Sequence, residues 1–284
     1  MKKFLLATAA VLASTSAYAA DYAVVHPFYT PAQGKFVSTT ALDYEHASMQ
    51  DKAWDWKTRG HEITLSEELK YGVTNDIQVG IEISRDWMKG KGKDAEGLVL
   101  PASTHEYTNY WGLTAGYNII NDGKAFLNAS LTYSQTVGKT KPTWTNDDEH
   151  AKVIGLEIFG GYNLDEFTVF GSIGYVRQID GEKENLLMGT KDEKDKIYTL
   201  EAGVFKAFNN QISAKASLSA EIDETKNAEE RSYWLNVGGD YSLSKKMAVG
   251  VNAGYLIDND VDDRTIVPDT HRGYKLGVDF TVEF

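Results

Sequence analysis

The last twelve residues, Gly273 to Phe284, read GYKLGVDFTVEF and alternate without exception from Tyr274 onward. Every second position is apolar, whereas the positions between carry charged, polar or glycine residues. This period of two residues is typical of a β-strand with one apolar face. Terminal residues usually fray unless they are tied down. The pattern therefore predicts a strand that pairs along its length and buries its apolar face.

The first residues, MKKFLLATAAVLASTSAYAA, have the layout of a secretory signal peptide. Two lysines precede an apolar stretch, and small residues close on Ala17-Tyr18-Ala19. We expect cleavage to leave Ala20 first. The apolar stretch is too short to span a bilayer, and no later run of about 18 apolar residues exists, so we expect no transmembrane helix.

Composition excludes several classes of protein. The chain has a formal charge of −12, and removing Lys2 and Lys3 with the signal peptide makes it −14, which argues against a nucleic-acid partner. It has no cysteine, which excludes disulfides, a lipid anchor on cysteine and thiolate chemistry. Nothing indicates a cofactor. The mean hydropathy of −0.38 looks soluble, yet alternating strands hide hydrophobicity from such averages.

The same alternation recurs eleven times before the terminal segment, which predicts twelve strands. The other expected strands are residues 35–46, 61–71, 77–87, 107–119, 125–133, 152–162, 167–177, 198–208, 212–222, 233–241 and 247–257. Five short connections, rich in the Asn, Asp and Gly that tight hairpins need, alternate strictly with six longer polar ones. We expect the longer loops at residues 47–60, 88–106, 135–150, 179–196, 223–231 and 258–272.

Aromatic residues recur at one end of the expected strands. Every second strand ends just before its short turn with an outward aromatic residue: Tyr71, Tyr117, Tyr162, Phe208, Tyr241 and Phe284. We interpret these six residues as an aromatic girdle at a bilayer interface. A soluble sandwich or lipocalin-type barrel is the alternative, but twelve strands with these modest apolar residues inside could not fill the enclosed volume.

The pattern therefore predicts an all-β transmembrane antiparallel up-and-down β-barrel of twelve strands, with short periplasmic turns and long extracellular loops. The expected division is a signal peptide at residues 1–19, an extended periplasmic segment at 20–33 and the barrel at 34–284. The two prolines of the segment 20–33 would favour an extended lead-in, or a strap that partly enters the lumen.

The signal peptide, the hairpins and the terminal VDFTVEF resemble Gram-negative outer-membrane β-barrel proteins of the porin-like, twelve-stranded kind. The resemblance implies an outer-membrane location, contact with lipid and lipopolysaccharide, and small solutes as cargo. It also implies that Phe280, Val282 and Phe284 form a signal for the β-barrel assembly machinery. We expect a monomer.

The polar parity of the strands predicts the residues that line the lumen. We expect pore-lining side chains at Asp43, Glu68, Glu82, Glu157, Glu201, Lys215, Glu221, Lys275 and Asp279. An acidic lumen concentrates cations, so the first hypothesis is a channel for passive, weakly cation-preferring diffusion of small solutes. The alternative is a structural or surface-interaction barrel whose side chains fill the lumen. Inward glycines, which leave room inside, favour a passage.

Small twelve-stranded channels for acidic sugars resemble the chain in size, but their lumens are lined with basic residues. Here only Arg177 is expected near an inner wall, which argues against an acidic sugar. Six aromatic residues have inward parity: Tyr110, Phe126, Phe159, Phe170, Phe205 and Trp234. They could stack against flat solutes, but we favour filling of the barrel near the turns. Phe159 and Phe170 are expected to face each other directly across their hairpin.

Enzymatic and metal-binding functions are weaker hypotheses. His46-Ala47-Ser48 has the spacing of an outer-membrane phospholipase pair, and Asp269-Thr270-His271 that of half an omptin protease site. Their partner residues are not identifiable, so we expect no catalytic site. His46, His61 and His271 could converge at the outer rim, but chance placement in loops is the simpler account, so we expect no metal site.

Overall fold

The computed structural model describes residues 30–51, 56–93, 99–100, 104–141, 148–180, 196–224, 228–263 and 270–284. Its strands are β1 (Phe36–Asp51), β2 (Trp56–Gly72), β3 (Ile77–Lys93), β4 (Val99–Leu100), β5 (Thr104–Asn121), β6 (Ala125–Lys141), β7 (Asp148–Leu164), β8 (Phe167–Asp180), β9 (Lys196–Ala207), β10 (Ile212–Glu224), β11 (Ala228–Ser244), β12 (Met247–Asp263) and β13 (Thr270–Glu283). Among these described residues, no helix is long and apolar enough to cross a membrane.

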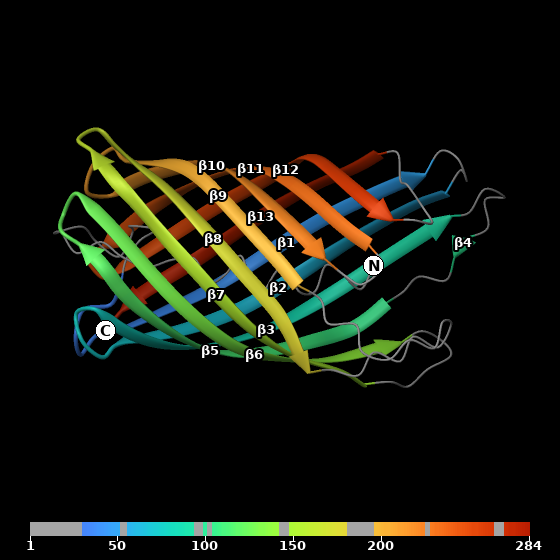
Figure 1. Cartoon of the computed structure of the whole chain (residues 1–284), viewed down its shortest axis with the longest axis horizontal. Coiled ribbons are helices and arrows are strands. Elements are labelled where there is room, and N and C mark those ends of the chain that lie inside the picture. Colours follow the sequence, from blue (N-terminus) through green and yellow to red (C-terminus); the bar gives the residue numbers. More distant parts are fainter. Residues whose placement is uncertain are drawn as a thin grey trace.

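Twelve long strands close into one antiparallel barrel, as the sequence predicts (Figure 1). Each long strand pairs with its two neighbours, and the ring closes where β13 pairs with β1 from Val37↔Glu283 to Gln50↔Thr270. The two-residue strand β4 pairs only with the loop end of β3. Closure leaves no long unpaired edge, so the backbone groups of the wall are paired within the barrel.

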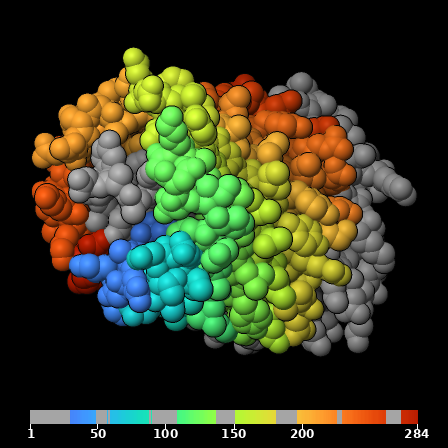
Figure 2. Space-filling model, turned by 60° about the vertical axis from the view of Figure 1, so that its left-hand side comes forward, coloured from blue at the N-terminus to red at the C-terminus, as the bar shows by residue number. Residues whose placement is uncertain are grey.

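The outer wall is apolar. Exposed large hydrophobic residues occur on every long strand, for example Ile83 on β3, Leu131 on β6, Leu200 on β9 and Val251 on β12. Figure 2 shows successive colours side by side across this wall, because consecutive strands are neighbours. An exposed apolar band on a closed barrel matches a lipid environment, in which alternate residues face hydrocarbon.

The strands are longer than the sequence predicts, and the six long loops are correspondingly shorter. The loop expected at 47–60 lies largely within β1 and β2, which pair as far as Asp51↔Trp56. Likewise, β6 and β7 pair as far as Lys139↔Asp148. About 9–11 tilted residues suffice to cross a bilayer, and these strands have 12 to 18. Backbone pairing therefore continues beyond the length that a bilayer requires.

Side-chain oxygens close four of the five short turns. Thr74 Oγ1 accepts hydrogen bonds from the backbone of Asp76 and Ile77, Asp122 Oδ1 from Lys124 and Ala125, and Asn209 Oδ1 from Gln211 and Ile212. Ser244 Oγ accepts one from Lys246. The fifth turn instead places Asp165 at φ 47°, a left-handed conformation that Asp tolerates. The Asn, Asp and Ser content of these connections therefore has a direct structural use.

A short strap, residues 30–35, precedes β1 and lies against the inner side of the wall. Gly34, at φ 80°, reverses the chain, and its N–H donates to the Gly72 carbonyl while the Gly72 N–H donates to Lys35. A Cβ at Gly72 would lie 2.2 Å from the Ala32 carbonyl oxygen. Position 72 has the parity of Lys70, which faces inward, so the strap crosses the lumen side of β2. Pro31 is fully buried there.

The expected signal peptide at 1–19 and residues 20–29 of the expected periplasmic segment lie outside the described residues.

Candidate functional site: the lumen

Burial alternates along the strands and identifies the lumen face. On β2, for example, Glu62, Thr64 and Ser66 are buried, whereas His61, Ile63 and Leu65 between them are exposed to the outside. The same alternation places all nine predicted pore-lining residues on the inner parity of their strands, where each is buried or half-buried. Most of the acidic residues among them lie around one of three lysines, and each lysine with its carboxylates forms a cluster.

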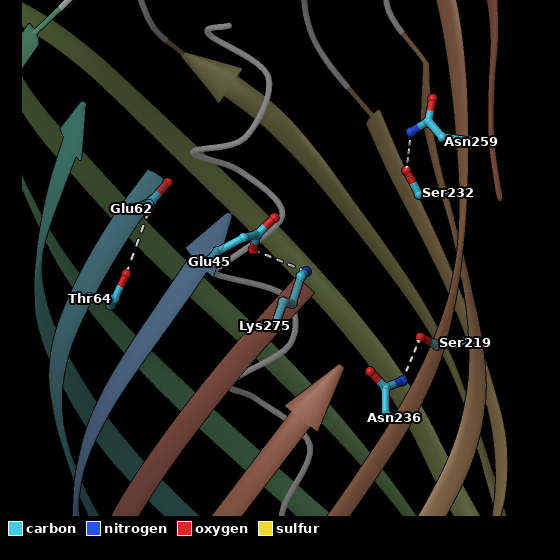
Figure 3. Close-up of polar contacts among 8 residues, drawn as sticks. All are labelled: Glu45, Glu62, Thr64, Ser219, Ser232, Asn236, Asn259 and Lys275. Carbon is cyan, nitrogen blue, oxygen red and sulfur yellow. Dashed lines mark hydrogen bonds and ion pairs between the residues drawn. The ribbon is translucent and has the colours of Figure 1, made fainter. Parts of the chain in front are cut away.

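Lys275 on β13 is the centre of the first cluster (Figure 3). Its ammonium lies 3.2 Å from the Glu45 carboxylate on β1 and 4.1 Å from the centre of the Trp234 ring on β11. Its charge also acts on Asp43 and on Glu221 of β10. Lys275 thus interacts with residues on both sides of the β1–β13 seam. Its distance from the Trp234 ring is that of a cation–π contact.

Lys70 on β2 is the centre of the second cluster. Its Nζ lies 2.9 Å from Glu68 on the same strand, and its charge acts on Glu82 of β3 and on Glu157 of β7. Glu157 also interacts with Glu201 on β9, whose carboxylate accepts a 2.5 Å hydrogen bond from Ser217. Glu157 lies four strands around the ring from Lys70, so the influence of this lysine extends beyond its neighbouring strands.

Lys215 on β10 is the centre of the third cluster. Its charge acts on Asp279 of β13 and on Asp240 of β11, and Asp240 accepts a 3.1 Å hydrogen bond from Ser213. The prediction missed Asp240, although its parity with Trp234 on the expected strand could have revealed it. It also missed Asp223, a buried residue of β10 one position beyond the expected end of that strand.

Arg177 does not approach the lumen. It is the register partner of Ile154, an exposed residue of the outer wall, and it is itself exposed. The expectation was wrong because residue 177 has the parity of Tyr175, which faces outward. In the described part of the barrel, the basic residues that face the lumen are lysines and not arginines.

The six predicted inward aromatic residues are all buried, with exposed fractions of 2% to 8%. Phe126, Phe159, Phe170 and Phe205 form one cluster near the short turns, which agrees with filling at that end. Phe159 and Phe170 are not direct partners, however, because Phe159 pairs with Ser172 and Phe170 with Gly161. The loop is Asp165–Glu166, one residue later than expected, so the rings meet diagonally at 6.0 Å.

Neutral polar side chains connect the lumen face between the charged clusters. Asn236 donates to Ser219 at 3.0 Å and Asn259 to Ser232 at 2.7 Å (Figure 3). Asn128 donates to Asn118 at 2.9 Å, and the hydroxyls of Thr39 and Thr281 lie 3.1 Å apart across the seam. These bonds pair polar side chains of neighbouring strands and hold them in defined positions.

Sequence comparison identifies the family of this barrel. The family model of the Gram-negative porins matches residues 28–262, which include all strands except β13 and the last residue of β12. The chain belongs to the Gram-negative porin family. This porin is therefore an outer-membrane protein. No curated protein sequence matches it significantly.

Solved structures share the fold of this porin at low sequence identity. An outer membrane channel from Pseudomonas putida F1 is 13% identical, with a TM-score of 0.60 over 95% of this chain and 100% of that one. The β domain of the Bordetella autotransporter BrkA is 10% identical, with a TM-score of 0.55 over 87% and 99%. The translocator domain of the autotransporter NalP from Neisseria meningitidis is 12% identical, with a TM-score of 0.54 over 88% of each chain.

The six aromatic residues predicted as a girdle lie at the short-turn end of the porin. Five of them are exposed on the outer wall, from 45% at Tyr162 to 61% at Phe284. Tyr71 is half-buried because its ring lies 4.6 Å from that of Phe36. At the opposite end, Trp111 and Tyr133 lie 5.7 Å apart and Tyr175 and Tyr198 5.2 Å apart. The terminal residues Phe280, Val282 and Phe284 share this outward parity.

The rim histidines partly come together. His46 and His61 are register partners on β1 and β2, and the His46 ring lies 5.2 Å from that of Tyr274. His271 pairs with Met49 on the same sheet, but its side chain lies outside the described part of the structure, as does Asp269. Among the described side chains, no three His, Asp or Glu residues are arranged to hold a metal ion.

Proposed function

We propose that this porin is a channel through which small solutes diffuse passively across the outer membrane, with a weak preference for cations. The observation that carries the proposal is the charge of the lumen face. Its acidic residues include Asp43, Glu45, Glu62, Glu68, Glu82, Asp86, Glu157, Glu201, Glu221, Asp223, Asp240 and Asp279, against Lys70, Lys215 and Lys275. Each lysine already acts on two or more carboxylates.

The excess of carboxylates supports selectivity by charge. Fixed negative charges in a narrow passage raise the local concentration of cations and repel anions. The internal lysines weaken this field without cancelling it, and the preference is therefore expected to be modest. The family, and the fold shared with the Pseudomonas putida channel, support the channel part of the proposal and are silent on its selectivity.

The test is the reversal potential of the refolded protein in planar bilayers with a KCl gradient. We expect a wild-type potential on the cation-selective side, and a shift toward zero in Asp43→Asn/Asp279→Asn because the lumen then loses two negative charges. Glu67→Gln is the matched control: it removes a charge from the outer wall of β2 and should leave the potential unchanged. Absence of conductance at every voltage, or preference for anions, would contradict the proposal.

A second candidate function is a structural or surface-interaction barrel with an occluded lumen. It is favoured by the tight packing of the lumen face, where Gln178 is 2% and Glu82 is 6% exposed. The similarity to autotransporter translocator domains shows that this fold also occurs outside diffusion channels. Stable insertion without conductance, together with binding of cells or envelope components through the loops, would support this function over the first.

A further inference from the structure

Two carboxylates flank one hydroxyl on the lumen wall toward the loop end. Glu62 on β2 and Asp86 on β3 are each 6% exposed. Thr64, 2% exposed, is the register partner of Asp86 and lies two residues from Glu62 on the same face. Thr108 on β5 is the other register partner of Asp86. The three strands are paired with one another here, and these side chains lie on the buried, inner parity of the wall.

The site has more hydrogen-bond acceptors than donors, because the two carboxylates have four oxygens whereas the hydroxyls of Thr64 and Thr108 carry one proton each. The Thr64 hydroxyl lies 3.5 Å from Glu62 Oε1 and also bonds to Asp86, but it carries only one proton. Asp86 Oδ1 is buried and accepts no hydrogen bond. A carboxylate can only accept hydrogen bonds, and buried acceptors are normally satisfied. The pair therefore has the chemistry of a receptor for a donor.

The charges around the pair are also uncompensated. Asp86 and Glu45 act on Glu62 with like charge, and Lys275 acts on it with opposite charge. That lysine is already held 3.2 Å from Glu45 (Figure 3), and its ammonium also lies over the Trp234 ring. Glu62 and Glu45 thus share one lysine, and the group that best complements the Glu62–Asp86 pair is a cationic donor.

We propose that the Glu62–Asp86 pair binds the primary ammonium group of a small amine during its passage through the lumen. The inference rests on the proposed channel function and names its preferred cargo. An ammonium has three N–H donors, which match Asp86 Oδ1 and the oxygens of Glu62. A hard divalent metal ion needs about six oxygen ligands, and the described side chains offer no group of three carboxylates or histidines placed for one.

The test uses 1,4-diaminobutane as the probe and 1,4-butanediol as its neutral isostere. In refolded wild-type protein, millimolar diamine should raise the thermal unfolding midpoint and reduce the K⁺ current several-fold, because a ligand of the native state stabilises it. The diol should do neither. The isosteric variant Glu62→Gln/Asp86→Asn should lose both effects of the diamine. Glu201→Gln, a lumen carboxylate bonded to Ser217, should retain both relative to its own baseline.

Each outcome decides a separate point. Equal effects of diamine and diol on the wild type, or an undiminished diamine effect on the double variant, would overturn the site. If the double variant does not refold, Asp86→Asn alone supplies the comparison, and the wild-type contrast needs no variant. Diamine stabilisation without any K⁺ current would contradict the channel function and leave the site standing. A K⁺ current without diamine binding would contradict the ammonium site and leave the channel function standing.

Discussion

Glu67 is a carboxylate on the outer wall, where the neighbouring positions of β2 are Leu65 and Leu69. It lies four positions before the girdle residue Tyr71, and therefore at hydrocarbon depth. Its two oxygens accept hydrogen bonds from the hydroxyls of Ser38, at 2.5 Å, and Thr40. Both hydroxyls come from β1, which pairs Thr40 directly with Glu67. The structure thus explains how a position that breaks the apolar pattern is tolerated.

Removing both hydroxyls should destabilise the barrel. We expect Ser38→Ala/Thr40→Ala to lower the free energy of unfolding by about 3–6 kcal/mol, because two hydrogen bonds to a charged group, each worth roughly 1.5–3 kcal/mol, are lost and a carboxylate would be left in lipid. The measurement is urea unfolding in phospholipid vesicles, followed by tryptophan fluorescence.

Adding Glu67→Leu to that variant supplies the control. Removing both partners of a hydrogen bond is nearly neutral, so the triple variant should regain most of the lost free energy of unfolding. If the double variant unfolds with the wild-type midpoint, or if Glu67→Leu does not rescue it, the hydroxyls do not support the carboxylate.

At the scale of elements, the short turns depend on side-chain oxygens that replace backbone partners. Backbone N–H groups of Ala125 and Lys124 hold the pKa of the Asp122 carboxyl below its ordinary value. A folded-state pKa below the unfolded one gives a stabilisation that is present above the unfolded pKa of about 3.9 and is lost as the pH falls through the folded value. This turn should therefore weaken in acid.

We expect Asp122→Asn to keep the turn, because Asn209 makes the same two hydrogen bonds in its own turn, while removing the dependence on pH. The midpoint of urea unfolding should fall less between pH 7 and pH 3 in this variant than in the wild type. Asp122→Ala should be less stable at both pH values because it lacks the acceptor. Equal acid sensitivity of Asp122→Asn and wild type would contradict the assignment.

The elements also show what a single sequence can determine. Alternation identified all twelve strands, the closing partner of the terminal strand and the six inward aromatic residues, because one face of each strand meets lipid. Register is set by one or two turn residues, and NLDE at 163–166 is compatible with more than one centre. For that reason Phe170 was placed opposite Phe159 instead of Gly161. Strand ends above the membrane were missed because polar residues there carry no alternation.

The sequence predicts which charged residues face the lumen, but it does not predict which of them contact one another. Parity alone places Lys275 and Glu221 inside, but their approach from β13 and β10 depends on the curvature and stagger of the closed ring. Asp240 could have been predicted from its strand, whereas Asp223 lay beyond the expected strand end. The buried oxygen of Asp86 is a property of packing, which no sequence pattern reports.

At the scale of the whole molecule, closure depends on the seam between β1 and β13. The Phe284 N–H donates to the Phe36 carbonyl at 2.9 Å, and the hydroxyls of Thr39 and Thr281 meet across the seam. Phe284 is also the most exposed of the girdle residues at the short-turn end, at 61%. It therefore serves two roles that can be separated: it ends the seam, and we propose that it is read by the assembly machinery.

Deleting Phe284 should reduce the folded fraction in the outer membrane several-fold, measured as heat-modifiable protein on gels. Phe284→Tyr should assemble normally because it keeps the backbone bond and the aromatic ring. Phe284→Ala keeps only the bond, so low assembly in cells together with normal refolding in vesicles would identify recognition as the missing step. Normal assembly of the deletion variant would contradict both roles.

The strap, residues 30–35, has a consequence for the closure of the barrel. Its Pro31 and Ala32 carbonyls lie on the inner side of Gly72, and Lys35 reaches Glu283 at 3.9 Å, next to the last residue of the chain. Residues 30–35 thus contact both the first hairpin, at Gly72, and the end of the closing strand, at Glu283. The strap therefore ties the two sides of the seam together at the short-turn end, next to the point where β1 and β13 begin to pair.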